Sequence, residues 1–117
     1  MEVLVVSNEF PPGPGGIGTH AHELSREGAR RGWRVTVVTN QDYADREEAR
    51  GFREVSPLRI IETPRRRPAL AAVLNRLRVV RRALRGRPDI VIATGVSSVW
   101  LLALLGRAGA APAWLAT

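Results

Sequence analysis

The sequence contains no cysteine and no lysine, and only 5% of its residues are aromatic. Without cysteine the chain can form neither disulfides nor a thiolate nucleophile, although this absence indicates no particular compartment. No apolar run approaches the roughly 20 residues of a transmembrane helix. The first ten residues carry an acid where a secretory signal needs positive charge. These absences predict a cytoplasmic protein.

The basic residues are all arginine, 18 in number against 11 acidic residues, and the formal net charge is +7. Such an excess favours anionic partners, which include phosphates, nucleic acid and acidic lipid surfaces. Codon usage in a GC-rich genome would give the same enrichment in arginine. Nucleic acid is not expected, because no recognised module and no aromatic stacking platform accompanies the charge.

The 117 residues, 44% hydrophobic and 25% charged, suit one globular domain and are too few for two. Apolar runs typical of strands buried on both faces of a sheet occur at 3–6, 34–39, 58–62, 89–94 and 112–117. Segments with helical spacing occupy 17–32, 68–86 and 98–106, and residues 41–50 form a loop or a short surface helix. This alternation predicts an α/β fold with a doubly wound, mostly parallel, Rossmann-like sheet.

The apolar residues of the two longer helical segments predict which helix faces are buried. In the first helix the expected buried positions are Ile17, Ala21, Leu24 and Gly28, with Gly32 as the stop. In the second they are Leu70, Val73, Leu74, Leu77, Val80 and Leu84, while the arginines occupy other faces.

A glycine- and proline-rich loop, NEFPPGPGGIGTH at 8–20, follows the first predicted strand. Gly13, Gly15 and Gly18 have the G-x-G-x-x-G spacing of NAD- and FAD-binding modules. That motif requires a glycine directly after the strand and an acid at the end of the second strand. Six residues separate Val6 from Gly13, and the second strand ends in Thr-Asn. A dinucleotide-binding module is therefore retained only as an alternative.

A second interpretation of this loop requires only that N–H groups near Gly15, Gly16 and Ile17 face outward at a helix start. The missing side chains would let a diphosphate approach, and the helix dipole would favour its negative charge. The prolines of the loop would lower the entropy lost when the loop is fixed. The glycine pair could equally make a tight turn with no ligand.

Residues 3–40 resemble the opening of the family-four retaining glycosyltransferases, which have a strand, then PP-x-x-GG-I-x-T-H, then E-L-x-x-x-L-x-x-R-G-H-x-V-x-V-x-T. The matching residues are Pro11, Pro12, Gly15, Gly16, Ile17, Thr19, His20, Glu23, Leu24, Arg31, Gly32, Val35, Val37 and Thr39. Residues 87–95, RPDIVIATG, resemble the fourth strand of the family. Trp33 departs from a common histidine, and Ile92 and Thr94 depart from the family's H-x-H pair.

The resemblance implies a two-domain enzyme of which residues 1–117 form an incomplete N-terminal Rossmann-like domain, without the donor-binding C-terminal domain. Its substrates would be a nucleotide-sugar donor and a sugar or lipid-linked acceptor, with no additional cofactor. The donor's diphosphate would be bound by Gly15, Gly16 and Ile17, and the substrates would also be contacted by Glu9 and His20. We expect no catalytic residue and no metal ligand in this chain, and His22 on the surface.

The arginine-rich segment RLRVVRRALRGR at 76–87 has leucine and valine on one side and a basic polar face on the other. This pattern allows peripheral contact with an anionic membrane, which would place the protein at the inner membrane face. It is equally typical of a helix that packs on a sheet and exposes its arginines to solvent. A basic interaction domain that binds nucleic acid or anionic membrane therefore remains a further alternative.

Overall fold

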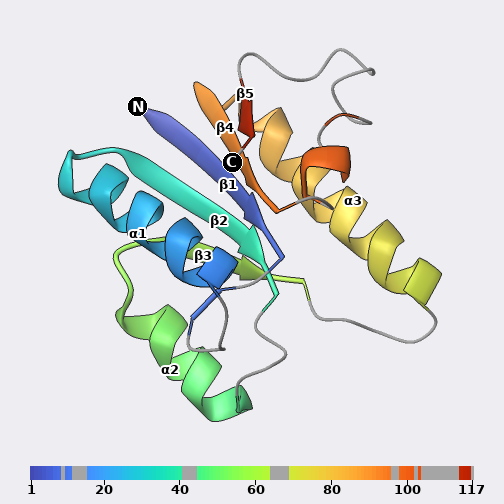
Figure 1. The fold of residues 1–117 in the computed structure, drawn as a ribbon, viewed down its shortest axis with the longest axis horizontal. Coiled ribbons are helices and arrows are strands. Elements are labelled where there is room, and N and C mark those ends of the chain that lie inside the picture. Colours follow the sequence, from blue (N-terminus) through green and yellow to red (C-terminus); the bar gives the residue numbers. More distant parts are fainter. Residues whose placement is uncertain are drawn as a thin grey trace.

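A five-stranded parallel sheet forms the centre of the computed structural model (Figure 1), which describes residues 1–8, 10–11, 16–40, 45–63, 69–95, 98–101, 103 and 114–116. Its strand order is β3-β2-β1-β4-β5. The strands are β1 (Glu2–Ser7), β2 (Arg34–Thr39), β3 (Arg59–Glu62), β4 (Ile90–Thr94) and β5 (Trp114–Ala116). Each predicted strand is present, and the predicted α/β Rossmann-like fold is confirmed.

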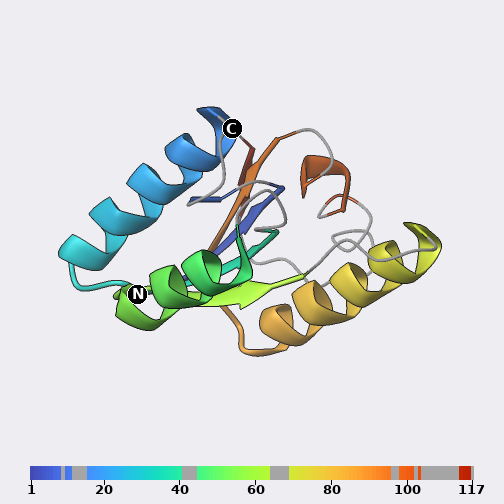
Figure 2. The same cartoon turned by 90° about the horizontal axis from the view of Figure 1, so that it is seen from below.

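Helices cover both faces of this sheet (Figure 2). They are α1 (Gly16–Arg30), α2 (Arg46–Val55) and α3 (Ala69–Arg85), and residues 98–101 are also helical. One apolar cluster joins α1 and α2 to the sheet through Val5 and Val37. The cluster on the other face joins α3 to the sheet through Leu4 and Val38. Because neighbouring strand residues point to opposite faces, each central strand is buried on both sides.

Helix α2 shows that residues 46–50 of the predicted segment 41–50 form a surface helix, and residues 41–44 lie outside the described part of the chain. It begins at Arg46 and continues to Val55, beyond the predicted segment. Its buried residue is Ala49, and Phe52 packs against the apolar cluster beneath α1. The helix is attached to β3 by an ion pair of 2.8 Å between Arg53 Nη1 and Glu62 Oε2.

The predicted buried stripe of α1 is wrong at one position. Ala21 and Gly28 are buried as predicted, whereas Leu24 is 37% exposed. Ser25 is buried in its place, and its hydroxyl donates a hydrogen bond of 2.7 Å to the Ala21 carbonyl oxygen. Small residues on this face let α1 approach the sheet closely, so the larger leucine points away. The side chain of Ile17 lies outside the described residues.

The predicted stripe of α3 is correct only in the C-terminal half of the helix. Val80 and Leu84 are buried, and Leu77 packs against their cluster. The three apolar residues of the first turns are exposed: Leu70, Val73 and Leu74. Figure 1 shows the reason, because the N-terminal half of α3 extends beyond the strands and has no sheet beneath it. Helical periodicity identifies a face of a helix but not the length over which a partner covers it.

Helix α1 ends at the predicted glycine stop. Gly32 has a φ of +84°, a left-handed conformation that glycine adopts without strain. The Gly32 amide donates to the Ala29 carbonyl (3.0 Å), and the Trp33 amide donates to the Gly28 carbonyl (3.1 Å). This pair of hydrogen bonds is the Schellman motif. It also places the Trp33 ring against Gly28, where an added Cβ would lie 2.9 Å from Trp33 Cε3.

Candidate functional site

Polar side chains are buried where the strands end. Ser7, Thr39 and Thr94 are the last residues of β1, β2 and β4, and Thr63 directly follows β3. Each of these four residues is at most 4% exposed, as is Asn40. Since the strands are parallel, these groups gather at one edge of the sheet, which we call the carboxyl edge. Such an edge is where open α/β sheets bind ligands.

The strand order reverses between β1 and β4. From β1 the chain proceeds outward through β2 and β3 on one side, and then returns to add β4 and β5 on the other. Ser7 of β1 is in register with Thr94 of β4 at this switch point. Helix α1 follows β1 on one face of the sheet, and the helical residues 98–101 follow β4 on the other face. Doubly wound sheets usually bind ligands at such a switch point.

Arg76 of α3 joins three segments beside the switch point. Its Nη2 donates to the Ser7 carbonyl oxygen at 2.9 Å and to Ser98 Oγ at 3.1 Å. The Ser98 hydroxyl in turn donates to Asn8 Oδ1 at 3.4 Å. The partly buried guanidinium therefore fixes the end of β1 relative to the helical segment that follows β4. The sequence interpretation placed Arg76 away from the buried stripe, although its i, i+4, i+8 spacing with Val80 and Leu84 marks the buried face.

Two buried hydroxyls at the carboxyl edge have no hydrogen-bond partner within the described part of the chain. They are Thr39 Oγ1 and Thr94 Oγ1. A buried hydroxyl without a partner costs about 1–3 kcal/mol, so such a group in a native structure requires an explanation. Both hydroxyls lie at the carboxyl edge, where open α/β sheets bind ligands, so a role in ligand binding would explain them. Thr94 also occupies the place where the sequence comparison expected the second histidine of the H-x-H pair.

The first residue of α1, Gly16, provides a helix N-terminus at the same edge. Gly16 is exposed, and a Cβ built there would meet no atom of the described residues within 4 Å. Among the described glycines, only Gly32 and Gly95 have a φ in the left-handed range, so Gly16 does not. Neither backbone conformation nor crowding therefore requires a glycine at position 16. The first N–H groups of an α-helix lack intrahelical partners, and the missing side chain at position 16 leaves space beside them.

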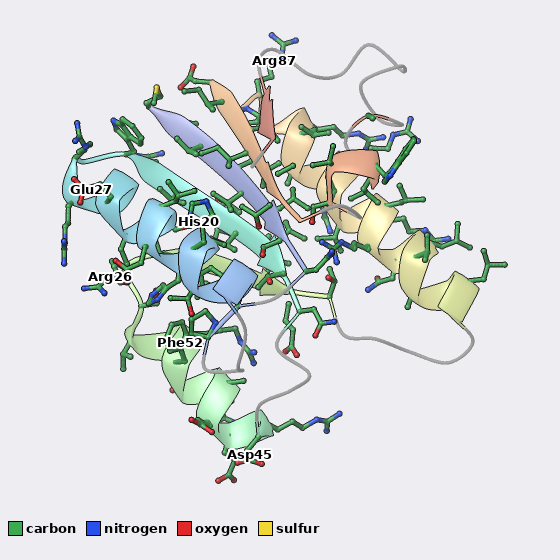
Figure 3. All side chains as sticks on the ribbon, in the orientation of Figure 1. His20, Arg26, Glu27, Asp45, Phe52 and Arg87 are labelled. Carbon is green, nitrogen blue, oxygen red and sulfur yellow. The ribbon has the colours of Figure 1, made fainter. Side chains whose placement is uncertain are left out.

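The other predicted site residues are described only in part. The backbone of Ile17 lies in the first turn of α1, and His20 is exposed one turn after Gly16 (Figure 3). Gly15 and Glu9 lie outside the described residues. The structure thus brings Gly16, Ile17 and His20 together at the start of one helix.

His22 is half-buried, whereas we expected it to lie on the surface. Its ring lies 5.3 Å from that of Phe10 and 5.2 Å from that of Phe52, in edge-to-face geometry. Burial lowers the pKa of His22 below its usual value, and the charge of Arg26 adds to this effect, while Glu23 opposes it. The aromatic cluster of Phe10, His22 and Phe52 joins α1, α2 and the segment after β1. It holds Phe10, near the start of the glycine-rich loop, against both helices.

Among the residues that the structure describes, no three His, Cys, Asp or Glu side chains form a group able to hold a metal ion. Glu9 and Asp42 lie outside these residues. The expectation that the chain holds no metal ligand therefore stays a prediction.

The profile of Glycosyltransferase Family 4 matches residues 14–115, which is nearly the whole chain. The chain belongs to glycosyltransferase family 4. No match was found among curated proteins. This match confirms the family-four part of the resemblance found in residues 3–40 and 87–95.

The fold of this family 4 chain is similar to that of MurG from Acinetobacter baumannii. The TM-score is 0.66 with 16% sequence identity, and the match covers 98% of this chain. The chain spans 34% of the length of the MurG chain. At this identity the likeness concerns the fold alone.

Proposed function

We propose that residues 1–117 form the N-terminal Rossmann-like domain of a two-domain retaining glycosyltransferase. The enzyme would transfer a hexose or similar sugar from a nucleotide-sugar donor to an acceptor in glycan biosynthesis. The observation that carries this proposal is Gly16, the exposed first residue of α1, which belongs to the family's glycine-pair motif and has no structural need to be glycine. Membership of glycosyltransferase family 4 supports the choice of reaction.

In the proposed mechanism, N–H groups near Gly15, Gly16 and Ile17 donate hydrogen bonds to the donor's diphosphate. The N-terminus of α1, equivalent to roughly half a positive charge, favours the negative charge that develops on the leaving nucleotide. Such stabilisation needs no covalent residue from this chain. Glu9 accepts a hydrogen bond from a sugar hydroxyl, and His20 positions the acceptor or a phosphate.

The carboxyl edge supplies further groups for the same reaction. Arg76 acts through its contacts with Ser7 and Ser98, because they set the separation between β1 and the segment after β4. The edge thus forms one wall of a cleft, and the second domain would form the other.

Calorimetry with the 117-residue chain distinguishes this function from the dinucleotide-binding alternative. We expect UDP- or GDP-sugars to bind with a dissociation constant of roughly 1 mM, which corresponds to a binding free energy of about −4 kcal/mol. NAD and FAD should bind more weakly still. We expect no sugar transfer by the chain alone, because one wall of the cleft is not in it. Tighter binding of NAD or FAD than of every sugar nucleotide tested would contradict the proposal.

We also propose that α3 makes peripheral contact with an anionic membrane, as suits a lipid-linked acceptor. Two of its exposed apolar residues, Leu70 and Leu74, share a helix face with three exposed arginines: Arg78, Arg81 and Arg85. Leu70 is 67% exposed, as is Trp100 in the helical segment on the same side of the sheet. Apolar and basic side chains on one face are typical of helices that lie in a membrane interface. No described helix combines the length and hydrophobicity of a membrane-spanning segment.

Co-sedimentation with phosphatidylglycerol-containing vesicles tests this contact. Replacing Leu70 and Leu74 by serine should reduce the affinity for these vesicles at least about tenfold, since burying each leucine contributes about 1.5–3 kcal/mol. Val55→Ser is the matched control, because Val55 is 83% exposed but lies on α2, on the other face of the sheet. Equal loss in the control, or equal binding to neutral vesicles, would exclude α3 as the anionic-membrane surface.

A further inference from the structure

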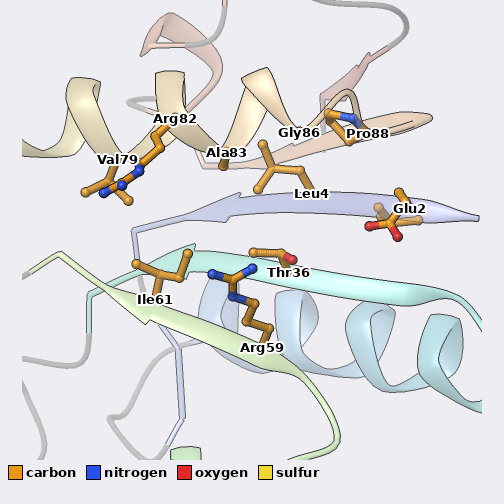
Figure 4. Close-up of a pocket in the computed structure, with 11 residues that line it drawn as sticks. Glu2, Leu4, Thr36, Arg59, Ile61, Val79, Arg82, Ala83, Gly86 and Pro88 are labelled. Atoms are coloured by element: carbon orange, nitrogen blue, oxygen red, sulfur yellow. The ribbon is translucent and has the colours of Figure 1, made fainter.

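A cavity of about 600 Å³ lies between α3 and the β1–β2–β3 part of the sheet (Figure 4). Its apolar lining includes Leu4, Ile61, Val79 and Ala83. The cavity opens on the α3 face of the sheet, whereas α1 and Gly16 belong to the opposite face. It is therefore separate from the proposed diphosphate site.

The cavity follows from the positions of the helices. Val80 and Leu84 of α3 pack in one cluster with Leu4 of β1 and Val91 of β4, so α3 covers the middle of the sheet. Helices α1 and α2 cover β2 and β3 only from the other face. On the α3 side, Ile61 remains half-buried.

Two arginines extend from opposite walls of this cavity. Arg59 comes from β3 and Arg82 from α3, and both point into the space between these elements (Figure 4). Neither guanidinium has an ion pair or hydrogen bond with the described residues. The one carboxylate of the lining, Glu2, already pairs with Arg34 at 3.3 Å. The cavity thus combines an apolar floor with two exposed arginines at its opening, neither of which is paired with a carboxylate of the described residues.

We propose that this cavity binds a small amphipathic anion, namely a phosphate ester or carboxylate that carries an aliphatic or aromatic group. The volume lies within the range of roughly 300–1,000 Å³ that small-molecule pockets show, and such pockets are mostly apolar with a few polar groups. Guanidinium groups suit both carboxylate and phosphate, because their N–H donors match the spacing of the oxygens. The apolar body of the ligand would lie against Leu4, Ile61 and Ala83. This site goes beyond the proposed glycosyltransferase function and does not depend on it.

Titration of the 117-residue chain with 1-naphthyl phosphate, followed by amide NMR, tests the proposal. We expect saturable one-to-one binding with the largest shifts in β3 and the C-terminal half of α3. Inorganic phosphate lacks an apolar body and should bind at least about tenfold more weakly. Burying an aromatic group contributes more than the roughly 1.4 kcal/mol that corresponds to a tenfold change in affinity.

Two pairs of substitutions separate this cavity from general surface charge. Replacing Arg59 and Arg82 by glutamine should weaken binding at least about tenfold, because two charge-assisted hydrogen-bonding groups are lost. Replacing Arg81 and Arg85 by glutamine removes the same charge from residues of α3 that do not line the cavity, and it should change affinity by less than about twofold. Equal effects of the two pairs, or equal affinity for inorganic phosphate, would overturn the proposal.

A third variant tests the cavity without altering charge. Ala83→Leu adds a larger side chain to the cavity wall, and it should abolish the binding of 1-naphthyl phosphate while the far-ultraviolet circular dichroism is unchanged. If this variant loses its fold, Ile61→Phe on the β3 wall provides the same test. Undiminished binding to a folded variant with a filled cavity would place the anion elsewhere and contradict the assignment.

Discussion

A Gly16→Val variant should bind uridine diphosphate at least about tenfold more weakly than the natural sequence. Each charge-assisted hydrogen bond to a phosphate contributes about 1.5–3 kcal/mol, and 1.4 kcal/mol corresponds to tenfold in affinity. Valine at the first position of α1 would occupy the open space beside the N–H groups and shield them from the ligand. The measurement is calorimetric or NMR titration of both proteins with uridine diphosphate.

Gly51→Val is the matched control for this substitution. Gly51 also has no atom within 4 Å of an added Cβ, and it lies within α2, away from the start of α1. Both variants should keep the native fold, because the added side chains enter open space. Only the change at position 16 should affect uridine diphosphate. Equal affinity of the Gly16→Val variant and the natural sequence would mean that the α1 N-terminus does not bind phosphate.

A Gly28→Ala variant should be destabilised, in contrast to the usual effect of this exchange in a helix. Replacing glycine by alanine in a helix interior normally gains about 1 kcal/mol. At position 28 the new Cβ would lie 2.9 Å from Trp33 Cε3 and 3.2 Å from Val35 Cγ2. Overpacking of this kind costs about 1–3 kcal/mol, which exceeds or cancels that gain, so we expect the free energy of unfolding to fall by up to about 2 kcal/mol. Urea denaturation followed by circular dichroism measures it.

Gly51→Ala provides the comparison within the same protein. Position 51 lies inside an exposed helix with open space around it, and alanine there should stabilise the chain by about 0.5–1 kcal/mol. Trp33→Leu should relieve much of the cost of Gly28→Ala, because a smaller side chain would leave room for the Cβ. Stabilisation of both glycine variants to the same degree would show that Trp33 does not require glycine at position 28.

The elements of the fold could be predicted from the sequence because apolar runs, helical spacing and stop residues are local signals. β2 begins and ends as predicted, and Gly32 ends α1. The sequence could not show how far each helix is covered. Leu70 and Leu74 continue the apolar spacing of α3 but lie where no strand supports them. This depends on the relative lengths of α3 and the sheet, which no local pattern encodes.

The candidate site could be predicted only where a motif marks it. The glycine pair located the start of α1, whereas Arg76 and the buried hydroxyl of Thr94 have no motif of their own. Their importance arises from the strand order, which brings β1 and β4 together across many intervening residues. His22 shows the same limit, because its aromatic neighbours Phe10 and Phe52 come from distant parts of the chain.

The central claim is that bare N–H groups at the N-terminus of α1 bind the diphosphate of a sugar nucleotide. Titration of the isotope-labelled 117-residue chain with inorganic pyrophosphate, observed through backbone amide shifts, tests it most directly. The account predicts saturable shifts that are largest at Gly16, Ile17 and Gly18 and that disappear in the Gly16→Val variant. Shifts confined to arginine-rich surfaces such as α3, unchanged by that substitution, would contradict it.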